Sequence, residues 1–126
     1  MAAVRDVMKT SLHSVDPSET VGEAVAVMAQ HRIGSVLVMQ DDRLLGIFTE
    51  RDTVRALSQA HDAARHEIVS WMTHDPKTVA PDMDTEDALR TMLDNGFRHL
   101  PVVERGKVVG MVSMRDLAGY SVLSSR

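Results

Sequence analysis

Two four-residue segments carry most of the side chains that could do chemistry in this sequence. Thr49–Asp52 reads TERD and Ser113–Asp116 reads SMRD, so both have a hydroxyl first, an arginine third and an aspartate fourth. Each segment follows an apolar run that predicts a strand and precedes a stretch that predicts a helix. The first N–H groups of such a helix lack backbone partners and lie at the positive end of the helix dipole, which favours an anion such as phosphate.

The two segments allow two interpretations. In the first, the hydroxyl binds a phosphate or ribose oxygen, the aspartate accepts hydrogen bonds from two ribose hydroxyls, and the arginine binds phosphate. In the second, the pattern [ST]-x-x-[DE] is a capping box that only begins a helix, which explains the hydroxyl and leaves the arginine unexplained. The residues that the nucleotide hypothesis assigns here are Thr49, Arg51, Asp52, Ser113, Arg115 and Asp116.

The segments belong to an internal repeat. A shift of 64 residues aligns nine identities without a gap between residues 6–54 and 70–118, among them Met8 with Met72 and Gly46 with Gly110. Chance at ordinary residue frequencies gives about three or four. A period of this length is too long for a solenoid repeat, so we expect two copies of a small domain, 1–62 and 63–126.

Each copy predicts the order β-α-β-β-α and an α+β fold. A capping box of Thr20 and Glu23, or of Asp84 and Asp87, begins an amphipathic helix, and two apolar runs around a polar turn follow. Neither half buries enough surface alone, so we expect the two copies to pack about a pseudo-two-fold axis. The expected segments are a helical lead (4–8, 68–72), an extended piece (12–15, 77–79), an apolar helical stripe (21–29, 88–93), two strands (36–39 with 44–48, 100–103 with 108–112) and a helix from Thr49 or Ser113.

The order and spacing of these motifs resemble a tandem pair of CBS domains (cystathionine-β-synthase domains), also called a Bateman module. The first copy carries the resemblance at 7–8 (VM), 14–17 (SVDP), 33–38 (IGSVLV) and 45–52 (LGIFTERD). The second copy carries it at 71–73 (WMT), 78–81 (TVAP), 96–103 (GFRHLPVV) and 109–116 (VGMVSMRD). Each motif is degenerate alone, whereas their order and duplication across nearly the whole chain are specific. The resemblance implies adenosine-nucleotide sensing in two clefts between paired sheets.

The resemblance also implies a residue set for each cleft. In the second cleft Gly34 and Ser35 stand where the first has the basic pair Arg98 and His99, so phosphate binding there would depend on the nearby Arg32. Without the resemblance, Arg98 and His99 are equally well read as solvated residues at a strand edge. The first cleft would use Ile47, Thr49, Asp52, Lys77, Arg98 and His99, and the second Met111, Ser113, Asp116, His13, Ser14 and Arg32.

Composition narrows the possible functions. The 126 residues include no cysteine and six histidines, and the histidines show no metal-ligand spacing, so we expect neither a disulfide nor a metal site. A net charge of -4 with scattered Lys and Arg argues against nucleic-acid binding. No apolar stretch is long enough to span a bilayer and no signal peptide is read, so we expect a cytoplasmic protein without a membrane partner.

These observations predict a regulatory module that binds an adenine nucleotide (AMP, ADP, ATP or a related adenosyl compound) and requires no other cofactor. Ligand binding would change the conformation of the module or the activity of an unidentified protein partner. A homodimer through the helices is expected, with the apolar stripes 21–29 and 88–93 suited to core packing and to such contact. The alternative is a structural or dimerisation module with empty clefts. An enzyme is not predicted, because no nucleophile or paired carboxylates are visible.

Overall fold

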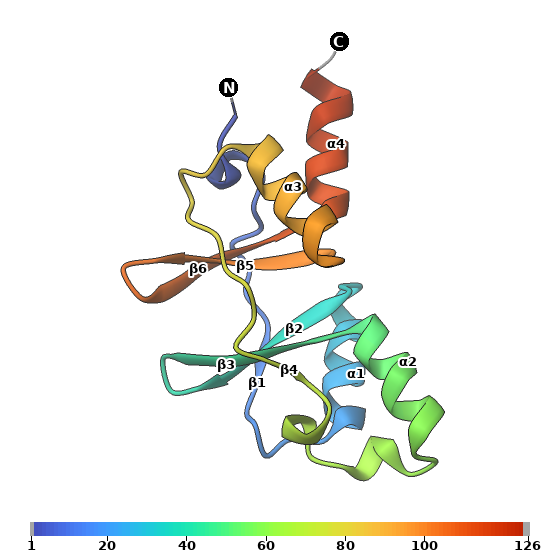
Figure 1. The fold of residues 1–126 in the computed structure, drawn as a ribbon. Helices are drawn as coiled ribbons and strands as arrows, with labels where there is room; N and C mark the ends of the chain where they lie inside the picture. The colour runs from blue at the N-terminus through green and yellow to red at the C-terminus, as the bar shows by residue number, and fades with distance from the viewer. Residues whose placement is uncertain (1, 125–126) are drawn as a thin grey trace. The chain divides into compact units, whose positions relative to one another are not determined.

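In the computed structural model, which describes residues 2–124, the chain divides into two compact units (Figure 1). The first unit is His13–Pro76, and the second joins the residues up to Leu12 to the residues from Lys77 onward. Each unit contains one of the two predicted strand-to-helix segments. The α+β class predicted from the sequence is confirmed.

The first unit is built on a sheet of four strands in the order β1-β2-β3-β4. β1 pairs parallel with β2, while the β2–β3 hairpin and the β3–β4 pair are antiparallel. The apolar runs that predicted the hairpin therefore form it, with one extra residue at each end. The elements are β1 (Ser14–Val15), α1 (Val21–His31), β2 (Ser35–Gln40), β3 (Arg43–Thr49), α2 (Glu50–Gln59), the 3-10 helices η2 (Ala63–Arg65) and η3 (Ile68–Ser70), and β4 (Thr73–His74).

The second unit repeats this plan with a reduced sheet. Its hairpin pairs β5 with β6, and single bridges, Val79 with Val102 and Lys9 with Met111, stand where the first unit has β1 and β4. The extended piece expected at 77–79 is thus one bridge, and the helical leads are single 3-10 turns. The elements are η1 (Val4–Asp6), α3 (Thr85–Asn95), β5 (His99–Glu104), β6 (Lys107–Ser113) and α4 (Met114–Ser124).

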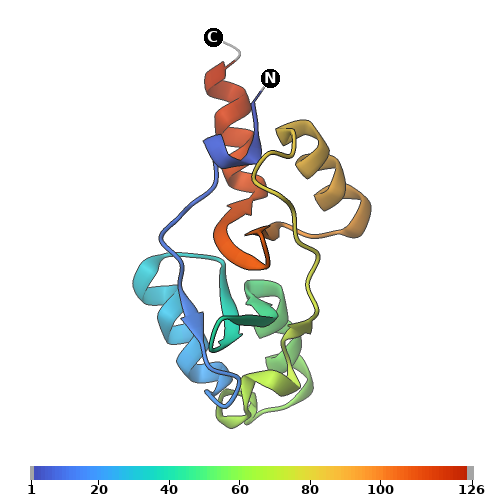
Figure 2. The ribbon, with the colours of Figure 1, turned by 90° about the vertical axis from the view of Figure 1, so that its left-hand side faces the viewer.

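The compact units differ from the two sequence repeats because the repeats exchange their lead segments. The Val4 and Arg5 amides donate to the carbonyls of Met83 and Pro81, so the N-terminal segment lies alongside the second repeat (Figure 2). The Ile68 amide donates to the Glu19 carbonyl in the same way. The division of the repeat into 1–62 and 63–126 stays a prediction, whereas residues 2–12 and 63–76 pack with the other copy.

The methionine and the glycine that recur in both repeats are explained by packing. A Cβ on Gly46 would lie 2.7 Å from Met72 Sδ, and one on Gly110 would lie 2.5 Å from Met8 Sδ. Because a Cβ cannot approach sulfur that closely, each glycine makes room for the methionine of the exchanged lead segment. The two Met–Gly pairs therefore hold each lead segment on the hairpin of the other repeat.

The helix ends follow the predicted signals with one exception. Thr20 and Glu23 form a capping box at α1. At α3 the Asp84 carboxylate accepts from the Glu86 amide, while the Asp87 carboxylate pairs with Arg90 at 3.6 Å, so the second capping box predicted there is wrong. The geometric reason is that the Asp84 side chain bonds one residue earlier than the third helical position.

Each unit has its own core, in which the helix stripe packs on the hairpin. Val21, Ala24 and Met28 of α1 are buried against β2 and β3, and Ala88 and Met92 of α3 against β5 and β6. The cores bury part of each stripe, whereas Leu93 of the second stripe is 64% exposed, so contact of the stripes with another chain stays a prediction. Among the residues whose side chains are described, the exposed large apolar ones are Leu12, Val54, Leu57, Val69 and Leu93.

Candidate functional site

A strand runs directly into a helix at two equivalent places, and both helix starts are fixed by backbone bonds. The Glu50 amide of α2 donates to the Gly34 carbonyl at 3.1 Å, and the Met114 amide of α4 donates to the Arg98 carbonyl at 2.8 Å. The residue before β2 or β5 thus satisfies the first amide of the helix. We call Thr49 with Asp52 the first cap, and Ser113 with Asp116 the second cap.

The first cap is a complete capping box. The Asp52 amide donates to Thr49 Oγ1 at 3.2 Å, and Asp52 Oδ2 accepts from the Thr49 amide at 3.0 Å and from Thr49 Oγ1 at 3.1 Å. The capping interpretation of TERD is confirmed at this place. The hydroxyl and carboxylate that the sequence assigns to ribose are therefore already bonded to each other.

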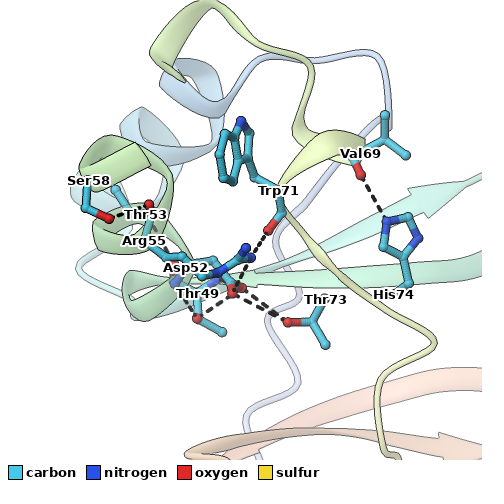
Figure 3. A network of polar contacts seen from close by, with 9 residues as sticks. All are labelled: Thr49, Asp52, Thr53, Arg55, Ser58, Val69, Trp71, Thr73 and His74. Atoms are coloured by element: carbon cyan, nitrogen blue, oxygen red, sulfur yellow. Dashed lines mark hydrogen bonds and ion pairs between the residues drawn. The ribbon is translucent and has the colours of Figure 1, made fainter. Parts of the chain in front are cut away.

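The first cap is also closed from outside the box by two further side chains (Figure 3). Arg55 Nη2 lies 3.4 Å from Asp52 Oδ1, and Thr73 Oγ1 of β4 lies 3.5 Å from both Asp52 oxygens. The Asp52 side chain is 9% exposed. An ionised carboxylate has about four acceptor positions, so the recorded donors take up its capacity.

Trp71 positions the arginine of this cap. Arg55 Nη2 donates to the Trp71 carbonyl at 2.6 Å, and the guanidinium carbon lies 5.7 Å from the centre of the Trp71 ring (Figure 3). The indole N–H in turn bonds His66 Nδ1 at 3.0 Å, and His66 Nε2 lies 3.0 Å from Asp62 Oδ1. This chain of contacts holds the Arg55 guanidinium at the Asp52 carboxylate.

The second cap has the reciprocal backbone bonds but fewer additional partners. The Asp116 amide donates to Ser113 Oγ at 3.0 Å, and Asp116 Oδ2 accepts from the Ser113 amide at 2.9 Å. Within the described part of the chain, Asp116 Oδ1 has one recorded partner, Lys9 Nζ at 3.8 Å. The Lys9 side chain is 72% exposed. The second carboxylate therefore keeps acceptor capacity that a bound hydroxyl could use.

The difference between the caps follows from the residues at equivalent positions of the repeat. Sixty-four residues separate Lys9 from Thr73, and Arg55 from the glycine of α4, Gly119. A Cβ placed on Gly119 would have no heavy atom within 4 Å. Among the described residues, the second cap thus has no counterpart of the Arg55 guanidinium.

The other predicted site residues divide between the units. His99 of β5 pairs with Ser113 of β6, and the Arg98 carbonyl bonds α4, so the predicted basic pair lies at the second cap within its unit. Its assignment to a cleft with the first cap stays a prediction. The first unit contains His13, Ser14, Arg32, Ile47, Thr49, Arg51 and Asp52, and the second contains Lys77, Arg98, His99, Met111, Ser113, Arg115 and Asp116.

Two of these residues have local contacts that the sequence did not indicate. The His13 ring stacks on His31 at the end of α1, with 3.9 Å between ring centres. Arg32 ends α1 in the left-handed region with φ 55°, where the second repeat has Gly96 at φ 70°. In the described residues no three of His, Asp and Glu come together as a metal site.

Sequence reasoning missed Arg55, Thr73 and Lys9 as partners of the cap carboxylates, and it missed Trp71 as the partner of Arg55. The signal for Arg55 was present, since it stands one turn after Asp52 on the same helix face. The signal for Thr73 and Lys9 was the repeat itself, because both directly follow the repeated methionine. What the sequence could not show is the exchange of lead segments, which brings Thr73 to Asp52 and Lys9 to Asp116.

Comparison with known proteins identifies the repeat unit. The model of the CBS domain matches residues 4–59 and 65–122. An uncharacterised 17.7 kDa protein of Acidianus ambivalens is 43% identical over 117 residues, which are 91% of this chain and 70% of that protein.

None of the helices in residues 2–124 is long and apolar enough to cross a membrane.

Solved structures share the fold over nearly their whole length. A CBS-domain-containing protein of Agrobacterium tumefaciens superposes with a TM-score of 0.91 at 30% identity, covering 95% of this chain and 99% of that one. The structure of CBSX2 in complex with AMP superposes with a TM-score of 0.85 at 25% identity, covering all of both chains (100% each).

Proposed function

The chain belongs to the CBS-domain family as a tandem pair, and on that premise we propose that it is a regulatory module that binds an adenosine ligand. The ligand class is AMP, ADP and ATP. The aspartates of the two caps are the groups that accept hydrogen bonds from the ribose hydroxyls. The bound state would differ from the free state in conformation or in its effect on a protein partner. The ligand would cause this change by binding one conformation of the module more tightly than the other.

One observation carries this proposal: each unit places a hydroxyl and a carboxylate together at the start of a helix, directly after a hairpin strand. Among the described residues, the Asp116 carboxylate has one charged neighbour at 3.8 Å and otherwise accepts from a single amide. Adjacent ribose hydroxyls need two acceptor positions on a carboxylate, which this group can supply. A CBS-pair relative in complex with AMP supports the choice of ligand class.

A ligand panel in a thermal-unfolding assay tests the proposal. A ligand at about a hundred times its Kd contributes about 2.7 kcal/mol to the native state. For a protein of this size we therefore expect AMP, ADP or ATP at millimolar concentration to raise the Tm by roughly 5–10 °C. Inosine monophosphate and phosphate are the matched controls. An unchanged Tm with every adenosine compound contradicts the proposal.

The alternative is an interaction module whose function is self-association. It is favoured by Val54 and Leu57, which lie one turn apart on α2 with 69% and 51% of their surface exposed. Light scattering after size exclusion measures the molar mass of the full chain and of Leu57→Glu. A homodimer through the helices predicts twice the chain mass for the wild type and a lower mass for the variant.

A further inference from the structure

Arg55 occupies the first cap in a way that the proposed function does not need. Ribose hydroxyls that bind Asp52 must donate to the same oxygens that already accept from Arg55, Thr49 and Thr73. Because a carboxylate has about four acceptor positions, a ligand can bind Asp52 only by displacing one of these donors. Thr49 is fixed by the helix cap, whereas the Arg55 side chain is 46% exposed and can move away.

The contacts of Arg55 show that its place at Asp52 is built by the first unit. Its bond to the Trp71 carbonyl is shorter than its contact with Asp52, 2.6 Å against 3.4 Å. The Trp71 ring beside the guanidinium and the His66 ring bonded to the indole N–H reduce the freedom of this side chain. Arg55 is therefore pre-positioned at the carboxylate by groups other than the carboxylate itself.

The second unit has the same backbone plan without these groups. Gly119 stands at the Arg55 position and Val7 at the Trp71 position of the repeat. The charged group near Asp116, Lys9 Nζ, is farther away at 3.8 Å and belongs to a side chain that is mostly in solvent. An exposed, flexible ammonium competes weakly for a carboxylate compared with a guanidinium that neighbouring groups hold in place.

We propose that Arg55 is a resident competitor for the ribose at the first cap, so that the two caps differ in ligand affinity and the second cap fills first. The proposal rests on the proposed function, since it assumes that an adenosine ligand binds the cap carboxylates. It adds that the chain responds to ligand concentration in two steps, because the first cap must release Arg55 before it binds.

The size of the effect follows from the contacts that must break. A partly exposed ion pair and one hydrogen bond to a carbonyl each contribute modestly to stability. Removal of the Arg55 side chain should tighten ligand binding at the first cap about fivefold. The same guanidinium placed at residue 119 should weaken binding at the second cap by a similar factor, about fivefold.

The test measures AMP binding by titration calorimetry on the full chain. Asp116→Ala isolates the first cap, and the double variant Asp116→Ala/Arg55→Ala removes the competitor in the same background. We expect the double variant to bind AMP about fivefold more tightly than Asp116→Ala alone. The competitor role is overturned if the two variants bind AMP with equal affinity or if neither binds it, while AMP binding by the wild type still supports the proposed function. If the wild type does not bind AMP, the competitor role and the proposed function both fail.

Two further readouts keep the test independent of the folding of one variant. Gly119→Arg should bind AMP more weakly than Gly119→Ala, which controls for the gain in helix propensity. Trp71 is the single tryptophan of the chain. Its emission should change when AMP displaces Arg55 in Asp116→Ala and should change much less when Arg55 is absent. The competitor role is contradicted if Gly119→Arg and Gly119→Ala bind AMP with equal affinity. It is also contradicted if the emission change is the same with and without Arg55.

Discussion

Asp52 and Asp116 occupy the same place in the repeat, yet the side chains around them differ. The Asp52 carboxylate accepts from Thr49, Arg55 and Thr73, and the Asp52 side chain is 9% exposed. The Asp116 carboxylate has Lys9 Nζ at 3.8 Å, and the Asp116 side chain is 15% exposed. The backbone of the cap is the same in both units. The same capping arrangement thus begins a helix in both units. A few neighbouring residues determine whether the cap carboxylate still has acceptor positions for a ligand.

The sheets differ in the same direction. β4 pairs with β3 over two residues in the first unit, while Lys9 makes a single bridge to Met111 in the second. The neighbour at Asp52 is therefore a short residue on a paired strand, and the neighbour at Asp116 is a long residue on an isolated bridge. The first unit thus combines a paired edge strand with more partners at the cap carboxylate, and the second combines a single bridge with fewer partners.

The largest expected difference between the units comes from the repeated glycines. A Cβ on Gly46 meets the Thr73 carbonyl oxygen at 2.6 Å, whereas a Cβ on Gly110 meets the flexible Met8 side chain and lies 3.1 Å from the Lys9 carbonyl. Gly46→Ala should cost about 3 kcal/mol and Gly110→Ala about 1 kcal/mol, because backbone yields less than a side chain. Urea unfolding measures both, and equal costs would contradict the distinction between a backbone and a side-chain close approach.

The cap aspartates should show opposite orders in stability and in binding. Asp52→Ala should cost about 2 kcal/mol of unfolding free energy, because it removes the cap and leaves Arg55 and Thr73 without their acceptor. Asp116→Ala should cost about 1 kcal/mol, the value of a cap alone. Calorimetry with AMP should rank them the other way, with the greater loss of affinity for Asp116→Ala. The same order in both measurements would remove the distinction between the caps.

Much of this organisation could be predicted from the sequence. The repeat, the hairpins and the helix starts at Thr49 and Ser113 follow from apolar runs and capping patterns, which are local signals. The exchange of the lead segments does not, because contacts between distant parts of the chain leave no periodicity. The state of each cap was hidden for the same reason: Thr73 and Lys9 reach the aspartates only through that exchange.

The smallest expected effect comes from the neighbours at the edge. Lys9→Ala should change the unfolding free energy by no more than about 0.3 kcal/mol, because the Lys9 side chain is mostly in solvent and its 3.8 Å pair with Asp116 is screened by salt. Thr73→Val should cost about 0.5 kcal/mol through the lost bonds to Asp52. Unfolding at low and high salt checks both. A large, salt-sensitive loss for Lys9→Ala would show that the second cap is closed as well.

A crystal structure of the full chain grown with AMP tests the central claim most directly. Our account predicts that the two ribose hydroxyls lie within hydrogen-bond distance of the Asp116 carboxylate, with Lys9 Nζ moved away from Oδ1. At limiting AMP, the Asp52 carboxylate should still hold Arg55. AMP bound with its ribose away from both aspartates, or bound at Asp52 first, would contradict the account.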